Sequence, residues 1–119
     1  MQRDARAWLW DIREAADAIS TFTAGVDFKT YSETPLIHSA VERKFEIIGE
    51  ALNLPSKANP DLARRIPEHA AIIAFRNQLI HGYSSVDHAR VWRIAHVSLP
   101  GLRAVAAALL DELGRSKPF

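Results

Sequence analysis

The chain has 119 residues, of which 48% are hydrophobic and 24% are charged, and its formal net charge at pH 7 is +1. This length suits one domain with a single core. The absence of cysteine excludes disulfides, thiolate metal sites and a cysteine nucleophile. We find no run of about 18 apolar residues and no leader-peptide pattern, so we expect a cytoplasmic protein without membrane insertion.

The charges are unevenly placed along the chain. Residues 1–54 carry six Lys/Arg and nine Asp/Glu, for a balance of −3, whereas residues 55–119 carry nine and five, for +4. The basic second half could attract a polyanion, although an excess of this size also fits an ordinary solvated surface.

Two long helices are predicted in the first half. Apolar residues at helical spacing predict a helix over residues 3–23, which Gly25 ends. The polar stretch through Ser32 and Glu33 is predicted to be a connection. Thr34 is expected to cap the next helix, with Pro35 at its first position. The apolar stripe of that second helix is wide and includes Leu36, Ile37, Ala40, Val41, Phe45, Ile47, Ile48, Ala51 and Leu52.

The second half predicts a short helix and two longer ones. Asn59, Pro60 and Asp61 resemble the cap and first turn of a short connecting helix. A third main helix should follow Pro67 and end near residues 80–81, before Gly82. The last helix should begin after a cap at residue 87 and kink near residue 99, because proline follows at residue 100.

No strand-period run or internal repeat interrupts this pattern. We therefore predict an all-α, up-and-down bundle of four main helices with a short connecting helix. Residues 1–113 should form one domain, and residues 114–119 should be a flexible tail.

The segment from Arg76 to Tyr83 concentrates chemically useful side chains. An arginine neutralises phosphate through a planar fork of donors, and a histidine transfers protons near neutral pH. Arg76 and His81 are five residues apart, which separates them by about 140° around a helix, whereas Asn77 nearly aligns with His81. Two copies meeting in a symmetric dimer would place two arginines and two histidines around one phosphate.

A purely structural explanation fits the same spacing. Arg76 could form a salt bridge to an acid of the second helix, His81 could cap its own helix, and Tyr83 could fill the core. Glu42, Glu46 and Glu50 stack on one helical face. Glu42 is expected to be solvated, whereas one of the other two is expected to pair with Arg76 and orient it.

The chain resembles the HepT-like branch of the HEPN superfamily. The hallmark of that branch is Arg, four residues, His, any residue and Tyr, which Arg76, His81 and Tyr83 match. The resemblance covers nearly the whole chain and extends to Phe45-Glu46-Ile47-Ile48-Gly49-Glu50-Ala51, Phe75-Arg76-Asn77, Val86-Asp87, Val91-Trp92 and Leu99-Pro100.

The resemblance implies a homodimeric endoribonuclease that cuts RNA without a metal, as the toxin of a toxin–antitoxin pair. Its partner would be a minimal nucleotidyltransferase antitoxin that can transfer AMP to Tyr83. Arg76 and His81 would be catalytic, with Asn77, Glu46 and Glu50 in support. The product would be a 2′,3′-cyclic phosphate. We further predict that four arginines guide RNA or contact an acidic partner, although each could simply be a solubilising residue: Arg64, Arg65, Arg90 and Arg93.

Both a metal site and a non-catalytic function have to be considered. The histidines at positions 38, 69, 88 and 96 form no close helical pair with an obvious third ligand, so no metal or other cofactor is expected. The alternative to the enzyme is a non-catalytic helical module that dimerises and binds a nucleotidyltransferase or a nucleotide.

Overall fold

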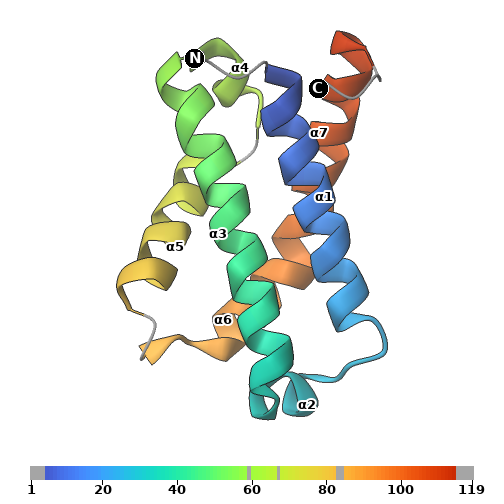
Figure 1. Ribbon diagram of the computed structural model, residues 1–119, viewed down its shortest axis with the longest axis vertical. Helices are drawn as coiled ribbons and strands as arrows, with labels where there is room; N and C mark the ends of the chain where they lie inside the picture. Colours follow the sequence, from blue (N-terminus) through green and yellow to red (C-terminus); the bar gives the residue numbers. More distant parts are fainter. Residues whose placement is uncertain (1–4, 59, 67, 83–84, 115–119) are drawn as a thin grey trace.

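The structure of the protein is a computed structural model that describes residues 5–58, 60–66, 68–82 and 85–114, with only the backbone of residues 54–58 (Figure 1). The described residues contain no β-strand, and the predicted all-α fold class is confirmed. In chain order the elements are α1 (Ala5–Thr23), α2 (Phe28–Glu33), α3 (Pro35–Ala58), α4 (Pro60–Arg64), α5 (His69–His81), α6 (His88–Arg93), the π-helical turn η2 (Ile94–Ser98) and α7 (Leu99–Leu113).

The four longest helices run up and down along the molecule, as predicted (Figure 1). α3 packs between α1 and α5, and α7 packs against α1. The short helix α4 lies at one end of the bundle, and α2 and α6 lie together at the other end. The ends of the bundle are therefore built from different short elements, and α5 ends near α2 and α6.

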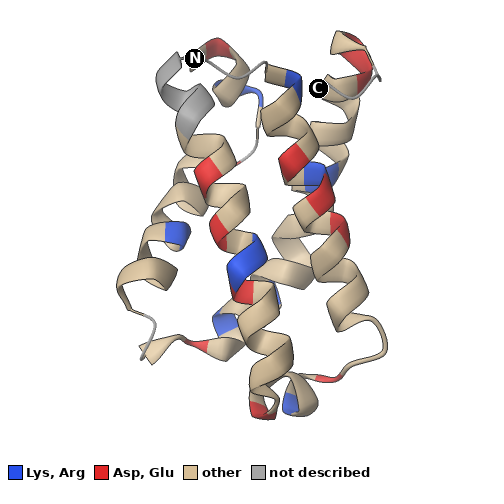
Figure 2. Ribbon diagram, viewed as in Figure 1, with Lys and Arg blue, Asp and Glu red and all other residues tan. Residues whose placement is uncertain are grey.

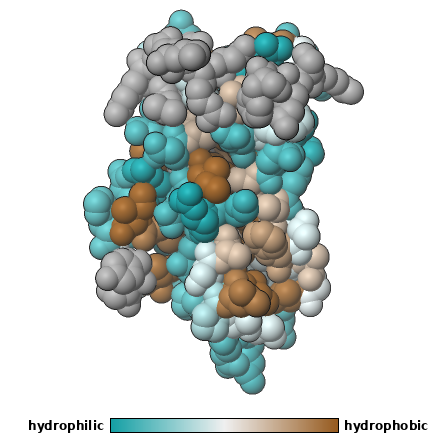
Figure 3. Space-filling model, viewed as in Figure 1, coloured by the Kyte–Doolittle hydropathy of each residue, from teal (hydrophilic) through white to brown (hydrophobic). Residues whose placement is uncertain are grey.

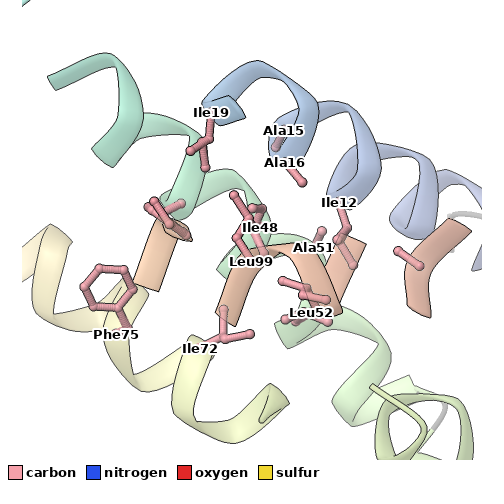
Figure 4. Packing of buried hydrophobic residues seen from close by; sticks show 14 of the residues in the cluster. Ile12, Ala15, Ala16, Ile19, Ile48, Ala51, Leu52, Ile72, Phe75 and Leu99 are labelled. Carbon is pink, nitrogen blue, oxygen red and sulfur yellow. The ribbon is translucent and has the colours of Figure 1, made fainter. Parts of the chain in front are cut away.

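The core is built from the apolar stripes that define the helices. Figure 4 shows Ile12 and Ile19 of α1 facing Ile48 of α3, with Phe75 of α5 and Leu99 of α7 closing the cluster. All five are at most 4% exposed. Burial of a side chain of this size contributes about 1.5–3 kcal/mol. This packing fixes the position of α5 relative to α3, which matters for the site described below.

The prediction of a connection through Ser32 and Glu33 was wrong, because residues 28–33 form α2. Asp27 caps this helix by accepting a hydrogen bond from the Thr30 backbone N–H at 2.8 Å. Tyr31 is completely buried and anchors α2 to the bundle. The Thr34 hydroxyl donates to the Thr30 carbonyl at 2.6 Å, so this side chain serves the end of α2, while the Thr34 backbone carbonyl accepts from Ile37 and His38 at the start of α3.

The predicted kink near residue 99 is confirmed, and it takes the form of the widened turn η2. The Leu99 N–H donates to the Ile94 carbonyl, five residues back. Pro100 has no N–H to offer the His96 carbonyl, and its ring would clash with that carbonyl in a regular helix. The wider π turn removes this conflict while the helix continues. The predicted cap at Asp87 is also confirmed, because its carboxylate accepts from the N–H groups of residues 89 and 90.

The helices α1 and α5 end shortly before the glycines that were predicted to end them. Gly25 follows α1 with φ +70°, a conformation that costs other residues more. Gly82 is the C-cap of α5, and its N–H donates to the Gln78 carbonyl at 2.8 Å. α3 continues through Pro55 and ends at Ala58.

Exposed apolar side chains are spread over the surface. On the face in Figure 3, hydrophobic patches are separated by hydrophilic side chains. The larger exposed apolar residues come from five elements and are Phe28, Leu36, Ile80, Val97 and Leu113. By length and composition alone, the helical run His88–Leu113 could cross a membrane, with a mean hydropathy of 1.3 in its most apolar window. Its second part, α7, packs against α1, and 28% of the apolar window is buried inside the bundle.

Candidate functional site

Arg76 lies on α5 where that helix comes closest to α3. A Cβ atom added to Gly49 would lie 2.2 Å from the Arg76 Cβ and 2.6 Å from its Cγ. Carbon atoms in contact are normally about 3.5–4.0 Å apart, so only glycine fits at this position. The aliphatic part of the Arg76 side chain therefore packs directly against the backbone of α3, and Gly49 determines the position of Arg76.

Two neighbours hold the Arg76 guanidinium. It forms an ion pair with Glu50 of α3, and Nη1 donates to the Asn77 side-chain oxygen at 2.8 Å. Its Nε is buried without a hydrogen-bond partner. The side chain is 24% exposed. The guanidinium is thus oriented from one side while part of its donor edge remains open to solvent.

The acidic residues of α3 have separate partners. Glu50 is the one that pairs with Arg76, as expected for one of the two candidates, whereas Glu46 lies 3.6 Å from Arg43. Asn77 faces Arg76, and within the described residues it makes no hydrogen bond to His81. Asn77, which was predicted to support the site beside His81, therefore contacts the arginine in this structure.

His81 is the last residue of α5 and is exposed. It lines a cavity of about 420 Å³ between the end of α5 and the start of α6, together with Asp87 and Arg90. Arg76 lines a different cavity of about 300 Å³ between α1, α3 and α5. Within the described residues the two side chains thus line different cavities, in agreement with their rotational separation around α5.

The two cavities differ in charge. Around Arg76 three carboxylates, from Asp11, Glu46 and Glu50, outnumber two guanidinium groups. Around His81 one carboxylate and one guanidinium balance. Figure 2 shows the acidic and basic positions interleaved along α3 beside α5. A phosphate at Arg76 must therefore compete with acids already present, or receive further positive charge from another molecule.

The four arginines predicted to guide RNA do not form one surface. Arg64 and Arg65 belong to the end of the bundle at α4, where they pair with Asp61 and Glu112. Arg90 and Arg93 belong to α6, near the opposite end of the bundle. Arg90 lines the His81 cavity, and its guanidinium donates to Gln78 and lies 5.5 Å from the Phe75 ring centre. Arg93 is exposed beside a third cavity.

Tyr83, the predicted AMP acceptor, lies outside the described residues. It follows His81 by two positions, and its role stays a prediction.

The expectation that Glu42 is solvated was wrong, and so was the expectation that no histidine forms a close helical pair with a third ligand nearby. The Glu42 side chain is only 17% exposed. It lies one turn from His38 on α3 and is covered by His88 from α6. The pairing of positions 38 and 42, four residues apart, was readable in the sequence, but the third residue comes from a remote segment.

An all-α bundle with an arginine and a histidine five residues apart at the end of one helix defines a HEPN-type helical protein. The chain belongs to the HepT-like family of that class, which it matches, under the description Ribonuclease HepT-like, over residues 12–109. The protein is thereby placed among ribonucleases, hydrolases that act on RNA.

Individual relatives agree with this assignment. The chain is 34% identical over 106 residues to Probable ribonuclease HepT of Thermococcus cleftensis, covering 87% of this chain and 93% of that protein. Two proteins of Methanocaldococcus jannaschii, each named a Putative RNase, are 33% identical over 104 and 114 residues. These matches cover 86% and 94% of this chain, and 93% and 92% of the relatives. No solved structure is significantly similar to the chain.

Proposed function

We propose that the protein is a metal-independent endoribonuclease that works as a homodimer. The observation that carries the proposal is the constrained position of Arg76, whose aliphatic part packs on Gly49 and whose guanidinium pairs with Glu50. This arginine comes five residues before an exposed His81. A solubilising arginine needs no fixed position, whereas an arginine that binds a phosphate for catalysis must be held in one orientation, because catalysis depends on orientation.

In the proposed reaction, the ribose 2′-oxygen attacks the adjacent phosphorus and the bond from phosphorus to the 5′-oxygen breaks. His81 accepts the proton of the 2′-hydroxyl, or donates a proton to the departing 5′-oxygen. Arg76 stabilises the charge that grows on the phosphate oxygens. The products are a 2′,3′-cyclic phosphate and a 5′-hydroxyl. DNA is not a substrate because it lacks the attacking hydroxyl.

The separation of Arg76 and His81 within one protomer supports a composite site. Within the described residues these side chains line different cavities, which favours a phosphate held between two copies over one held by a single chain. A second copy related by a two-fold axis can supply the missing partner, and its guanidinium would offset the carboxylates around Arg76. The dimer is therefore part of the proposed active site.

We also propose that the enzyme is a cytoplasmic toxin, paired with a minimal nucleotidyltransferase antitoxin that transfers AMP to Tyr83. A phosphate-bearing group at that position, two residues after His81, would obstruct the histidine. The support for this regulation is the family resemblance of the Arg76–Tyr83 segment. The alternative is a non-catalytic module that dimerises and binds a nucleotidyltransferase or nucleotide.

The test incubates the purified chain with RNA in EDTA and compares it with His81→Ala and Arg76→Ala. Both substitutions should abolish cleavage without changing the helical circular-dichroism signal. His69→Ala, at the other end of α5, is the matched histidine control and should cleave normally. Cleavage by pure His81→Ala protein would overturn the assignment and favour the binding module.

A second arm tests the composite site. Mixing the Arg76→Ala and His81→Ala proteins under conditions that exchange subunits should restore part of the activity, because a mixed dimer can contain one intact arginine–histidine pair. If both homodimers are inactive and the mixture stays inactive although mixed dimers form, the two residues do not come from different copies.

A further inference from the structure

At the end of the bundle where α2 and α6 meet α3, three potential metal ligands converge. His38 and Glu42 lie one turn apart on α3, with 3.3 Å between His38 Nδ1 and Glu42 Oε2. His88, the first residue of α6, places its Nδ1 3.7 Å from the same carboxylate oxygen. One ligand atom of each residue lies within 4.8 Å of the others.

The side chains of His38, Glu42 and His88 are 16%, 17% and 29% exposed, but the atoms that face one another are buried and make no hydrogen bond. His38 Nδ1, Glu42 Oε2, His88 Nδ1 and the Tyr31 hydroxyl are all inaccessible to solvent and make no hydrogen bond. Tyr31 is 0% exposed, and its ring lies 6.2 Å from each of the two imidazoles. An unsatisfied buried polar atom is costly, so the three ligand atoms of His38, Glu42 and His88, which lie within 4.8 Å of one another, indicate a missing common partner.

The ligand set favours a metal ion over a proton. Each neutral imidazole carries one N–H that could donate to the Glu42 carboxylate, but neither Nδ1 forms such a hydrogen bond in the structure. Two protonated imidazoles with ring centres 4.1 Å apart would repel each other. A cation between the three groups satisfies all of them together. Two imidazoles and one carboxylate are the ligands of zinc-class ions, whereas magnesium and calcium prefer oxygen ligands.

The spacing fits such an ion. Metal–ligand bonds of about 2.0–2.2 Å in a tetrahedron place neighbouring ligand atoms roughly 3.3–3.6 Å apart. The two nitrogen–oxygen distances of 3.3 and 3.7 Å are close to this value. The ligand atoms of the two histidines lie no more than 4.8 Å apart, and rotation of the partly exposed His88 ring would bring them closer. The fourth position would belong to a water or to the Tyr31 hydroxyl.

We propose that His38, Glu42 and His88 form a binding site for a divalent zinc-class ion. The ion would join α3 to the first turn of α6 and would lie next to the Tyr31 anchor of α2. Because Asp87, Arg90 and Val91 of the same region line the His81 cavity, the ion would fix one wall of that cavity. Its role is structural, and the proposal does not depend on the proposed cleavage reaction.

The experiment uses the untagged full chain, stripped with EDTA and desalted, in a calorimetric titration with Zn²⁺. We expect one ion per chain. At a free concentration about 100-fold above the dissociation constant, the melting temperature should rise by on the order of 10 °C. Glu42→Gln and His88→Gln should each weaken binding by at least about 100-fold, and His69→Gln should bind like the unchanged chain. Mg²⁺ should produce no comparable shift.

Co²⁺ provides a readout that needs no variant. Bound in this site, it should give the strong visible absorption of a four-coordinate ion, and Zn²⁺ should abolish that absorption at one equivalent. Absence of Zn²⁺ binding by the folded wild-type chain would overturn the proposal. Equal Zn²⁺ affinity in the folded Glu42→Gln variant and the wild-type chain would also overturn the proposal. If the variants fail to fold, the spectrum of the wild-type chain with Co²⁺ decides, because the spectrum of a six-coordinate ion would overturn the proposal.

Discussion

The close contact between Gly49 and Arg76 makes a sharp prediction for Gly49→Ala. The new methyl group would lie 2.2 Å from the Arg76 Cβ, more than about 1 Å inside a normal contact. Both atoms are fixed to helix backbones, so the overlap cannot be relieved by a flexible side-chain tip. α3 and α5 must separate, or α5 must shift and carry Arg76 with it.

The expected magnitude follows from two opposing effects. Overpacking of this kind costs about 1–3 kcal/mol or more, and alanine returns up to about 1 kcal/mol through its higher helix propensity. Because both atoms are fixed to helix backbones, we take the upper end of the overpacking cost, about 3 kcal/mol, and expect a net loss of about 2 kcal/mol in the free energy of unfolding. For 119 residues, the entropy of unfolding corresponds to about 0.25 kcal/mol per °C, so the melting temperature should fall by about 8 °C.

Gly101→Ala is the matched control for this experiment. Gly101 also lies within a helix, α7, but an added Cβ there has nothing within 4 Å. The same substitution should therefore stabilise the protein by about 0.5–1 kcal/mol and raise the melting temperature by about 2–4 °C. Thermal unfolding followed by circular dichroism measures both. Equal shifts of the same sign would refute the argument from close contact.

Two further predictions concern the charged and buried groups. Glu50→Gln should change the free energy of unfolding by less than about 1 kcal/mol, because the Glu50–Arg76 pair is exposed. It should lower kcat/KM by about 10- to 100-fold, because Arg76 is no longer held in one orientation. Glu46→Gln should lower kcat/KM less, and equal losses of kcat/KM in the two variants would contradict the assignment. Burial, with a smaller contribution from the Glu42 carboxylate, raises the pKa of Tyr31 above its ordinary 10.0. Above pH 10.0 the unfolded chain therefore loses the phenol proton before the folded chain does, and stability falls as pH rises. Urea unfolding across that pH should show a smaller fall in Tyr31→Phe, and identical slopes would argue against this cause.

The sequence predicted the parts of the fold that depend on long periodic patterns. The four main helices, the cap at Asp87, the end of α5 before Gly82 and the kink before Pro100 all follow from local chemistry. α2 was missed because six residues with one buried side chain, Tyr31, give no measurable period. The Thr34 side chain was assigned to the wrong helix end for a related reason, since the existence of α2 was needed to see its other partner.

The site was predictable to the extent that its geometry belongs to one helix. The rotational separation of Arg76 and His81 follows from their spacing, and one acid of α3 was expected to pair with the arginine. The role of Gly49 depends on how closely α5 approaches, which no local pattern reveals, although a glycine inside a helix is a signal of close packing. The burial of Glu42 depends on contacts between α6 and α3. The spacing of the glutamates along one helix cannot predict contacts with a second helix.

The widened turn η2 divides one continuous helix between two sets of contacts. Before it, α6 packs against α2 and forms a wall of the His81 cavity. After it, α7 packs against α1 and belongs to the central core. A π turn is a place where a helix can change direction without losing continuity. A tilt of α6 about this turn would change the width of the cavity at His81 while the α1–α7 packing stays in place, and an ion bound by His38, Glu42 and His88 would oppose that tilt.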